Sequence, residues 1–202
     1  MGRGRSPVGD VKIIENPLSF LDAENDEVIE RFFGKTEMNQ AQSGALWDYT
    51  MAGYSAINKY LRHGTPPADD EQAESVNGIK DIDSLIAAQT LNTPIKVIRG
   101  VDGAVFGLKS YDGTGEDLSG LVGSVFRDKG FTSTSVKYGA GFYGVQLEIT
   151  VPSGKGRGVY VGKESSHPTE NEYLLKRNSR FMITGYGKAP DGEALLKIQV
   201  ID

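Results

Sequence analysis

Two glutamates separated by a single residue, Glu170 and Glu172, follow a proline and precede the apolar run "YLL". In a strand, residues i and i+2 point to the same side, so a strand here would bring both carboxylates into one space, with Cα atoms roughly 7 Å apart. Two carboxylates beside one pocket can stabilise a cationic sugar and move the proton when a glycosidic bond breaks. The plain alternative is a solvated strand entrance, because most such charges lie on the surface.

An arginine at the end of another apolar run could complete such a site. Arg99 closes "IKVIRG" (95–100), and Gly100 would let a ligand approach the backbone closely. A guanidinium at this position suits bidentate binding of a phosphate or a carboxylate. A surface ion pair is the alternative that the sequence leaves open.

A hydroxyl-rich run offers further polar groups. "GFTSTSV" (130–136) is predicted to be a strand, with Ser133 and Ser135 on one face and Thr134 on the other. Hydroxyls on an inner face bind either the neighbouring backbone or a polar ligand. By contrast, "GKGRG" (154–158) lacks the spacing and the Ser/Thr of a phosphate-binding loop and is interpreted as a turn.

In this order, the strand-terminal arginine, the Ser-Thr-Ser strand and Glu-x-Glu closely resemble the mono-ADP-ribosyltransferase toxins. The set is most similar to the arginine-serine-glutamate class, which includes the catalytic domains of actin-modifying binary toxins. The likeness spans roughly 43–200 and includes "YTMAGYSAINKYLR", "IRG", "GFTSTS" and "ENEYLLKRNSRFMI". It implies an α+β, ADP-ribosyltransferase-like fold, in which N-terminal helices pack on two small, mainly antiparallel sheets that form a cleft for NAD.

The resemblance also implies roles for four catalytic positions. Glu172 matches the glutamate that bonds the nicotinamide-ribose hydroxyl and stabilises the oxocarbenium ion. Glu170 matches the first glutamate of the motif, which orients and activates an acceptor guanidinium. Arg99 matches the arginine on the NAD phosphates, and Ser133 matches the serine that braces the catalytic glutamate.

The positions that the resemblance assigns to NAD binding lie in the helical run 43–64, the apolar run 95–100, the hydroxyl-rich run 130–136, the segment 136–145 and the Glu-x-Glu motif. They are Tyr49, Tyr54, Asn58, Arg99, Gly100, Ser133, Thr134, Ser135, Phe142 and Glu172. The three helix positions would line the phosphate and nicotinamide-ribose side, and Phe142 would pack near nicotinamide. Simple core packing is the alternative for Tyr49 and Phe142, because folds bury aromatic rings anyway.

Three departures limit what can be carried over from the family pattern, and the last of them bears on target choice more than on chemistry. Gly130 stands where the most similar toxins carry asparagine. The segment "VKYGAGFYGV" (136–145) lacks the second phosphate-binding arginine of some members. His167 occupies the position of an aromatic residue that recognises the protein substrate, and it is therefore a candidate for substrate recognition together with Glu170.

The function that the resemblance implies is NAD-dependent mono-ADP-ribosylation of a protein, with NAD as co-substrate and no metal. Two glutamates in the motif are associated with arginine acceptors, so the expected target is an arginine of actin or another host protein. The chain is expected to act in a host cytosol after secretion or injection. An NAD glycohydrolase, with water as the acceptor, and a non-catalytic binding module on the same fold remain alternatives; a carbohydrate-directed glycoside hydrolase is a weaker one, since no aromatic sugar groove is evident.

The pattern of the chain predicts one domain over 1–202. Residues 1–20 are interpreted as a flexible lead, 21–92 as mainly helical and 95–202 as mainly β. The last part alternates short β-rich runs with Gly, Asp and Asn turns, and one of these runs is "AVFGL" (104–108).

Helical periodicity and end signals predict three helices. They are "DEVIERFFGK" (26–35), "SGALWDYTMAGYSAINKYLRHG" (43–64) and "GIKDIDSLIAAQTLNTP" (78–94). Gly34 is expected to end the first helix and Ser43 to cap the second. Prolines and acidic residues predict a loop over 63–72.

Composition excludes several classes of partner and site. The net charge of −5 argues against nucleic acid as the main partner, because phosphate binding needs a basic surface. Two histidines and no cysteine argue against a metal site and a Ser-His-Asp triad, and they rule out disulfides. No apolar run approaches the length that spans a membrane, so no membrane partner is expected.

Overall fold

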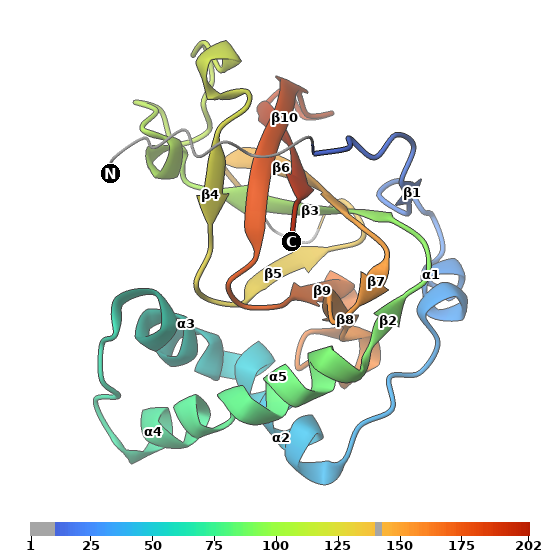
Figure 1. The fold of residues 1–202 in the computed structure, drawn as a ribbon, viewed down its shortest axis with the longest axis vertical. Coiled ribbons are helices and arrows are strands. Elements are labelled where there is room, and N and C mark those ends of the chain that lie inside the picture. The colour runs from blue at the N-terminus through green and yellow to red at the C-terminus, as the bar shows by residue number, and fades with distance from the viewer. Residues whose placement is uncertain (1–10, 140–142) are drawn as a thin grey trace.

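A helical layer lies against one end of a twisted sheet. The structure is a computed structural model that describes residues 11–139 and 143–202. In Figure 1 the helices α2 to α5 lie together below the strands, and α1 lies at the side beside β1.

The N-terminal segment joins the side of the sheet. β1 (Leu18–Ser19) pairs in parallel with the start of β3, and α1 (Asp26–Phe33) follows. Asn25 caps α1 by accepting a hydrogen bond from the Glu27 amide. The helix ends at Gly34, as predicted, where φ of 68° favours a residue without a side chain.

The helical layer contains one long bent helix and two shorter ones. Its elements are α2 (Gln40–Asp48), the π-helical turn η1 (Tyr49–Gly53), α3 (Tyr54–His63), α4 (Asp70–Asn77) and α5 (Ile79–Ala88). The predicted start at Ser43 is wrong. Asn39 caps the helix instead, and its side chain and that of Gln42 bond reciprocally to each other's backbone amides.

The acidic segment that was predicted to be a loop contains a helix start. Asp69 accepts a hydrogen bond from the Gln72 amide and caps α4. Acidic residues in a first turn stabilise the positive end of a helix, so the cluster that looked like a loop is partly a capping signal.

Strands fill most of the second half of the chain. They are β2 (Thr90–Leu91), β3 (Ile95–Val101), β4 (Val125–Arg127), β5 (Thr132–Ser135), β6 (Val145–Val151), β7 (Gly154–Lys155), β8 (Gly158–Tyr160), β9 (Glu172–Leu175), β10 (Arg180–Lys188) and β11 (Ala194–Val200). The strand predicted over 104–108 is wrong, because Gly103–Phe106 forms a 3-10 turn that Asp102 caps. The segment 154–158, interpreted as a turn, holds β7 and the start of β8.

Among the described residues, nine strands share one hydrogen-bonded sheet in the order β4-β10-β11-β6-β3-β5-β9-β8, with β1 beside β3. β3 pairs with β6 along its whole length but with β5 only at Ile98 and Ser135. The two expected sheets are therefore two parts of one path, joined at this narrow link. The pairing is mainly antiparallel, with parallel pairs at β1–β3 and β6–β11.

The described residues form two hydrophobic cores, and alternation along β9 divides its side chains between them. Tyr173 and Leu175 enter the core between the two parts of the sheet. Leu174 enters the core under the helices, with Ile57 and Phe131. Glu172, two residues before Leu174, therefore belongs to the helix-facing side of the strand.

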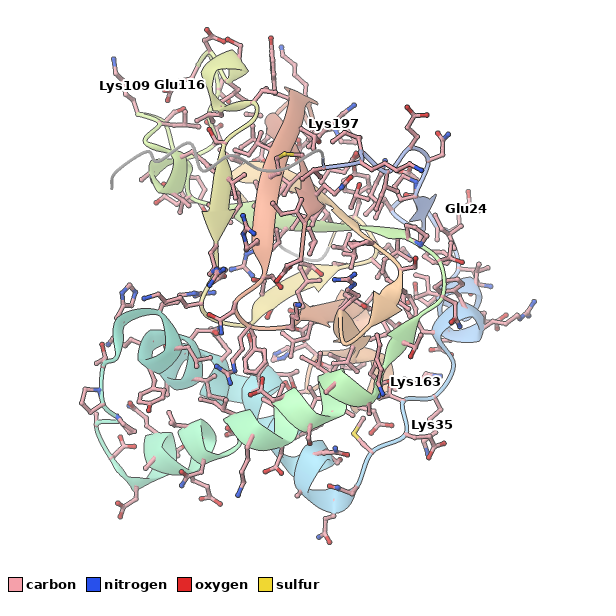
Figure 2. All side chains as sticks on the ribbon, in the orientation of Figure 1. Glu24, Lys35, Lys109, Glu116, Lys163 and Lys197 are labelled. Atoms are coloured by element: carbon pink, nitrogen blue, oxygen red, sulfur yellow. The ribbon has the colours of Figure 1, made fainter. Side chains whose placement is uncertain are left out.

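Charged side chains cover the outside of the molecule. Figure 2 shows Glu24, Lys35 and Lys109 directed away from the ribbon, as expected for groups that are costly to dehydrate. Within the described ranges, no helix has the length and apolar content needed to cross a bilayer.

Candidate active site

A cleft of about 800 Å³ opens between the long bent helix and the two parts of the sheet. Its walls come from η1, α3, β3, β5 and the segment around Glu170. The lining residues are Tyr49, Thr50, Met51, Tyr54, Ser55, Asn58, Lys59, Arg62, His63, Arg99, Ser133, His167, Glu170 and Glu172. Arginine, serine and both glutamates, which lie far apart in the sequence, thus meet at one cavity.

The register of β5 and β9 brings Ser133 and Glu172 onto one face. Ser135 is paired directly with Glu172, and Ser133 with Leu174. Directly paired residues of antiparallel strands point to the same side, and so do residues two apart. Ser133 and Glu172 therefore share the helix-facing side, and Thr134 lies on the opposite side, as the period of the strand predicted.

The Glu172 carboxyl group is almost fully buried, with 6% of the residue exposed. Burial raises its pKa to about 7 from an ordinary value of 4.5. The Glu170 charge adds to the rise, whereas a hydrogen bond with Ser133 and the charges of Arg99 and His167 oppose it. Near neutral pH this group is thus poised between its two protonation states, which is typical of catalytic carboxyl groups.

Arg99 lies near the end of β3, directly after Ile98, the residue through which β3 pairs with β5. Its Nη1 donates a hydrogen bond of 2.6 Å to the Ser133 carbonyl, which connects the two parts of the sheet at the cleft. Burial lowers the pKa of the guanidinium. Among the described residues no carboxylate lies within ion-pair distance of it, so its remaining donors are available for an anion.

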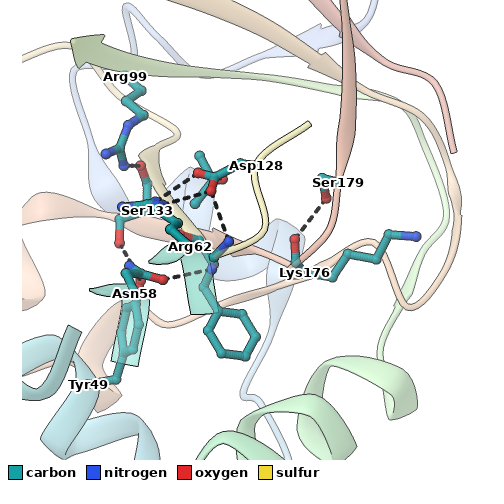
Figure 3. A network of polar contacts seen from close by, with 11 residues as sticks. Tyr49, Asn58, Arg62, Arg99, Asp128, Ser133, Lys176 and Ser179 are labelled. Atoms are coloured by element: carbon teal, nitrogen blue, oxygen red, sulfur yellow. Dashed lines mark hydrogen bonds and ion pairs between the residues drawn. The ribbon is translucent and has the colours of Figure 1, made fainter. Parts of the chain in front are cut away.

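The helical wall is fixed by a chain of polar contacts that Figure 3 shows. The Asn58 side chain accepts a hydrogen bond from the Phe131 amide (2.9 Å) and donates one to the Tyr49 hydroxyl (3.1 Å). The Tyr49 hydroxyl lies 3.3 Å from the Ser133 hydroxyl. Burial raises the pKa of Tyr49 to about 12, so this hydroxyl stays neutral. The chain holds Ser133 in place from the helical side.

Two predicted residues lie at the exposed rim. Tyr54 is 51% exposed, and its ring meets that of Tyr49 edge-on at 6.5 Å. His167 is exposed, and its Nδ1 lies 2.8 Å from the Ser166 hydroxyl. The Ser166 amide donates to the Thr50 hydroxyl of η1, which ties this loop to the helical wall.

Glu170 and Glu172 both line the cleft, as predicted. The predicted reason, that they are alternate residues of one strand, is wrong. β9 begins at Glu172, and Glu170 ends a 3-10 turn (Pro168–Glu170). Asn171 between them has φ of 48° and ψ of 47°, the left-handed conformation. A left-handed turn, and not a pleated strand, therefore sets the direction of Glu170.

Three of the described residues predicted to bind NAD, Gly100, Thr134 and Ser135, are not among those that line the cleft. The Thr134 hydroxyl is buried and donates to the Tyr173 carbonyl, and the Ser135 hydroxyl lies 2.7 Å from the carbonyls of both Lys137 and Glu170, between which it shares its one proton. Gly100 is partly buried in β3 opposite Gln146. Phe142 lies outside the described residues.

Sequence reasoning missed a second arginine at the cleft. Arg62 of α3 forms a bidentate ion pair with Asp128, at 2.8 Å for both bonds, and also donates to the Phe131 carbonyl. It follows Asn58 by four residues, and a helix places such residues on one face. That spacing could have identified Arg62, but nothing in the sequence links it to Asp128. Among the described residues, no three metal-ligating side chains lie together.

The glycine before Phe131 is explained by close packing. A Cβ atom at Gly130 would lie 2.4 Å from Asn58 Oδ1 and 2.9 Å from Arg62 Nε. Any residue with a side chain at this position would therefore require Asn58 or Arg62 to move. Glycine thus allows α3 to approach the start of β5.

Gly130→Ala should displace Asn58 from the Phe131 amide and lower the free energy of unfolding by about 1–3 kcal/mol. Denaturant unfolding would measure the loss. Gly120→Ala is the matched control, since no atom lies within 4 Å of the position that its Cβ would take and its φ is not positive. Equal stability of the two variants would contradict the packing explanation.

Glu172→Gln should stabilise the fold increasingly as the pH rises. Folded protein keeps the Glu172 proton up to about pH 7, whereas the unfolded chain releases it near 4.5, so wild-type stability falls between these values. The glutamine side chain of the variant does not titrate, so the variant does not lose unfolding free energy in this way. The difference in unfolding free energy should grow from near zero at pH 4 to roughly 3 kcal/mol at pH 8, at about 1.4 kcal/mol per pKa unit.

Thermal unfolding of both proteins across this pH range tests the expectation. Glu24→Gln, at an exposed carboxylate, is the control and should give a difference that does not grow with pH. A Glu172→Gln difference that is constant with pH would show that the wild-type carboxyl titrates normally.

Comparison with known proteins agrees with this geometry. The profile of the ADP-ribosyltransferase exoenzyme family matches residues 26–200. NAD(+)–arginine ADP-ribosyltransferase EFV of Enterococcus faecalis is 28% identical over an alignment of 171 residues, and the match covers 75% of this chain and 32% of that protein. The chain thus spans about a third of the length of this relative.

Solved structures show the same fold. Plx2a, an ADP-ribosyltransferase toxin from Paenibacillus larvae, has a TM-score of 0.74 and 22% identity, with 92% of this chain and all of that chain covered. BECa of a C. perfringens binary enterotoxin, solved with NADH, has a TM-score of 0.75 and 22% identity, with 92% and 50% covered. The predicted α+β, ADP-ribosyltransferase-like fold is confirmed. Since the family match covers most of its length, this chain belongs to the ADP-ribosyltransferase exoenzyme family.

Proposed function

We propose that this chain transfers ADP-ribose from NAD to an arginine side chain of a target protein. One observation carries the proposal: a buried carboxyl group, Glu172, lies in a large cleft with Arg99, while Glu170 lines the same cleft. The similarity to an arginine-directed relative supports the choice of acceptor. Actin or another host protein is the proposed target, on the basis of the motifs alone.

The residues of the cleft fit NAD as co-substrate. Arg99 is partly buried and has no carboxylate partner among the described residues, so a diphosphate would bind its remaining donors. Lys59 lines the same cleft and adds positive charge, whereas the charge of Arg62 is already paired with Asp128. Tyr54 offers an exposed ring and Asn58 an amide along the wall. A volume of about 800 Å³ is within the range of pockets that hold molecules of cofactor size.

Glu172 would supply the main electrostatic stabilisation. When bound, NAD supplies an ADP-ribosyl group whose C–N bond to nicotinamide breaks, and nicotinamide leaves with the electron pair. The ionised Glu172 places its negative charge beside the ribose that becomes electron-poor. Because Glu172 itself is almost fully buried, this charge acts more strongly than it would in water. Ser133 bonds to the Glu172 carboxyl group, and the Tyr49 hydroxyl contacts Ser133 in turn, so the two residues hold this carboxyl group in position.

Glu170 would act on the acceptor. It is half-buried at the end of the 3-10 turn, so it can face an arginine that enters from outside. The carboxylate would hydrogen-bond the guanidinium and accept the proton that is lost when a guanidinium nitrogen bonds to the ribose. His167, exposed beside it, is the proposed contact with the target protein.

Variants of Glu172 and Glu170 test whether the first acts on nicotinamide release and the second on transfer to arginine. Glu172→Gln should lower both nicotinamide release and arginine labelling by about 10²–10³-fold, because the stabilising charge is removed. Glu170→Gln should lower labelling to a similar degree and retain NAD hydrolysis. Labelled NAD, free arginine and host extract would be used, with mass spectrometry to locate the modified residue.

Near-normal turnover by Glu172→Gln would remove the central assignment. Equal loss of both activities in Glu170→Gln would contradict its role toward the acceptor. A wild-type protein that releases nicotinamide but labels neither arginine nor extract would be an NAD glycohydrolase instead.

A further inference from the structure

We propose that Asn171 is a positioning residue, which the Tyr160 hydroxyl holds so that Glu170 is aimed at the acceptor arginine. The proposal rests on the function proposed above and assigns a role to a residue that does not line the cleft. Its consequence is a choice of acceptor: with Asn171 fixed, arginine is favoured over water.

The backbone at Asn171 gives the first argument. Its left-handed conformation connects the 3-10 turn that ends at Glu170 to the strand that begins at Glu172. Asparagine is one of the few residues with a side chain that adopts this conformation readily. The angle between the two glutamates therefore depends on this one residue.

Hydrogen bonds to three consecutive carbonyls hold this turn. The Ser135 hydroxyl donates to the Glu170 carbonyl at 2.7 Å, and the Val136 amide donates to the Asn171 carbonyl at 3.1 Å. The Val161 amide donates to the Glu172 carbonyl at 2.9 Å. Neighbours on both sides thus hold the three carbonyls of the turn, and Ser135 supports the turn although it is not among the residues that line the cleft.

The Asn171 side chain points into the protein, with 3% of the residue exposed. Its Oδ1 accepts a hydrogen bond of 2.9 Å from the Tyr160 hydroxyl, and the Tyr160 ring stacks on Phe33 of α1 at 4.4 Å and 14°. The aromatic stack anchors the hydroxyl, so Asn171 is tied to a rigid part of the fold.

An ion pair lies near the Asn171 side chain. Asp26, the first residue of α1, forms an ion pair of 2.8 Å with Lys137. The hydrogen bond from Lys137 lowers the pKa of Asp26, and the Asn171 side chain contributes in the same direction. The Asn171 Nδ2 donates a long hydrogen bond of 3.5 Å to the Thr169 carbonyl, so the side chain uses both its acceptor and its donor, as suits a neutral amide.

The two glutamates depend on this contact to different degrees. Glu172 belongs to a strand that is paired with β5 and β8, so its position is secured without the Asn171 side chain. Glu170 precedes the left-handed residue and has no strand partner of its own. Loss of the amide contact should therefore loosen Glu170 and leave Glu172 in place.

Two variants of the full chain separate the contact from the backbone conformation. Tyr160→Phe keeps the stacked ring and removes the hydroxyl. Asn171→Gly keeps the left-handed conformation, which glycine adopts freely, and removes the amide. Controls are Tyr186→Phe, at an exposed tyrosine of β10, and Asn178→Gly, at another left-handed asparagine with φ of 64°.

Arginine labelling, NAD hydrolysis, the KM for NAD and the melting temperature would be measured for all four. Both test variants should lower the kcat of arginine labelling about 10-fold or more, because small misplacements of a reacting group are costly in rate. NAD hydrolysis and the KM for NAD should stay within about threefold of wild type, because only the group that acts on the acceptor is displaced. The controls should keep the wild-type ratio of labelling to hydrolysis.

An unchanged ratio in the folded test variants would overturn the proposal, and so would a parallel fall of both activities, which indicates a general structural role. A wild-type chain that hydrolyses NAD and labels no arginine would refute the proposed function, and this role with it. If the wild-type chain labels arginine and the variants keep its ratio of labelling to hydrolysis, only the role of Asn171 is refuted and the proposed function stands.

Discussion

The burial of one carboxyl group, Glu172, is the constraint on which the rest of the site depends. A carboxylate that leaves water loses much of its hydration, and here that cost raises the pKa to about 7. Ser133 and Arg99 oppose the rise without abolishing it. The group is consequently stabilised best when positive charge develops beside it, which is the condition that the proposed reaction supplies.

The fold provides this environment by joining two parts of a sheet at a narrow link and covering the join with a bent helix. Arg99 connects the parts through the Ser133 carbonyl, and Tyr49 and Asn58 connect the helix to the same strand. A π-helical turn in the bent helix places Tyr49 at the cleft, as such turns often do at functional sites. Core packing and site geometry are therefore made by the same elements.

The sequence predicted the features that depend on local periodicity and missed those that depend on distant contacts. The period of two correctly placed Ser133 and Thr134 on opposite faces. The same rule failed for the glutamates, because it assumes an extended residue between them, and Asn171 is left-handed. The ion pair of Arg62 and Asp128 joins positions 66 residues apart, so no local sequence pattern could predict it.

The ionisation of Glu172 can be observed directly by ¹³C NMR of its side-chain carboxyl group, assigned with the Glu172→Gln variant. In the free protein the titration midpoint should lie near pH 7. An unreactive NAD analogue with the nicotinamide cation should lower it, since a nearby positive charge favours the ionised form. A midpoint near 4.5 that the analogue leaves unchanged would contradict the account.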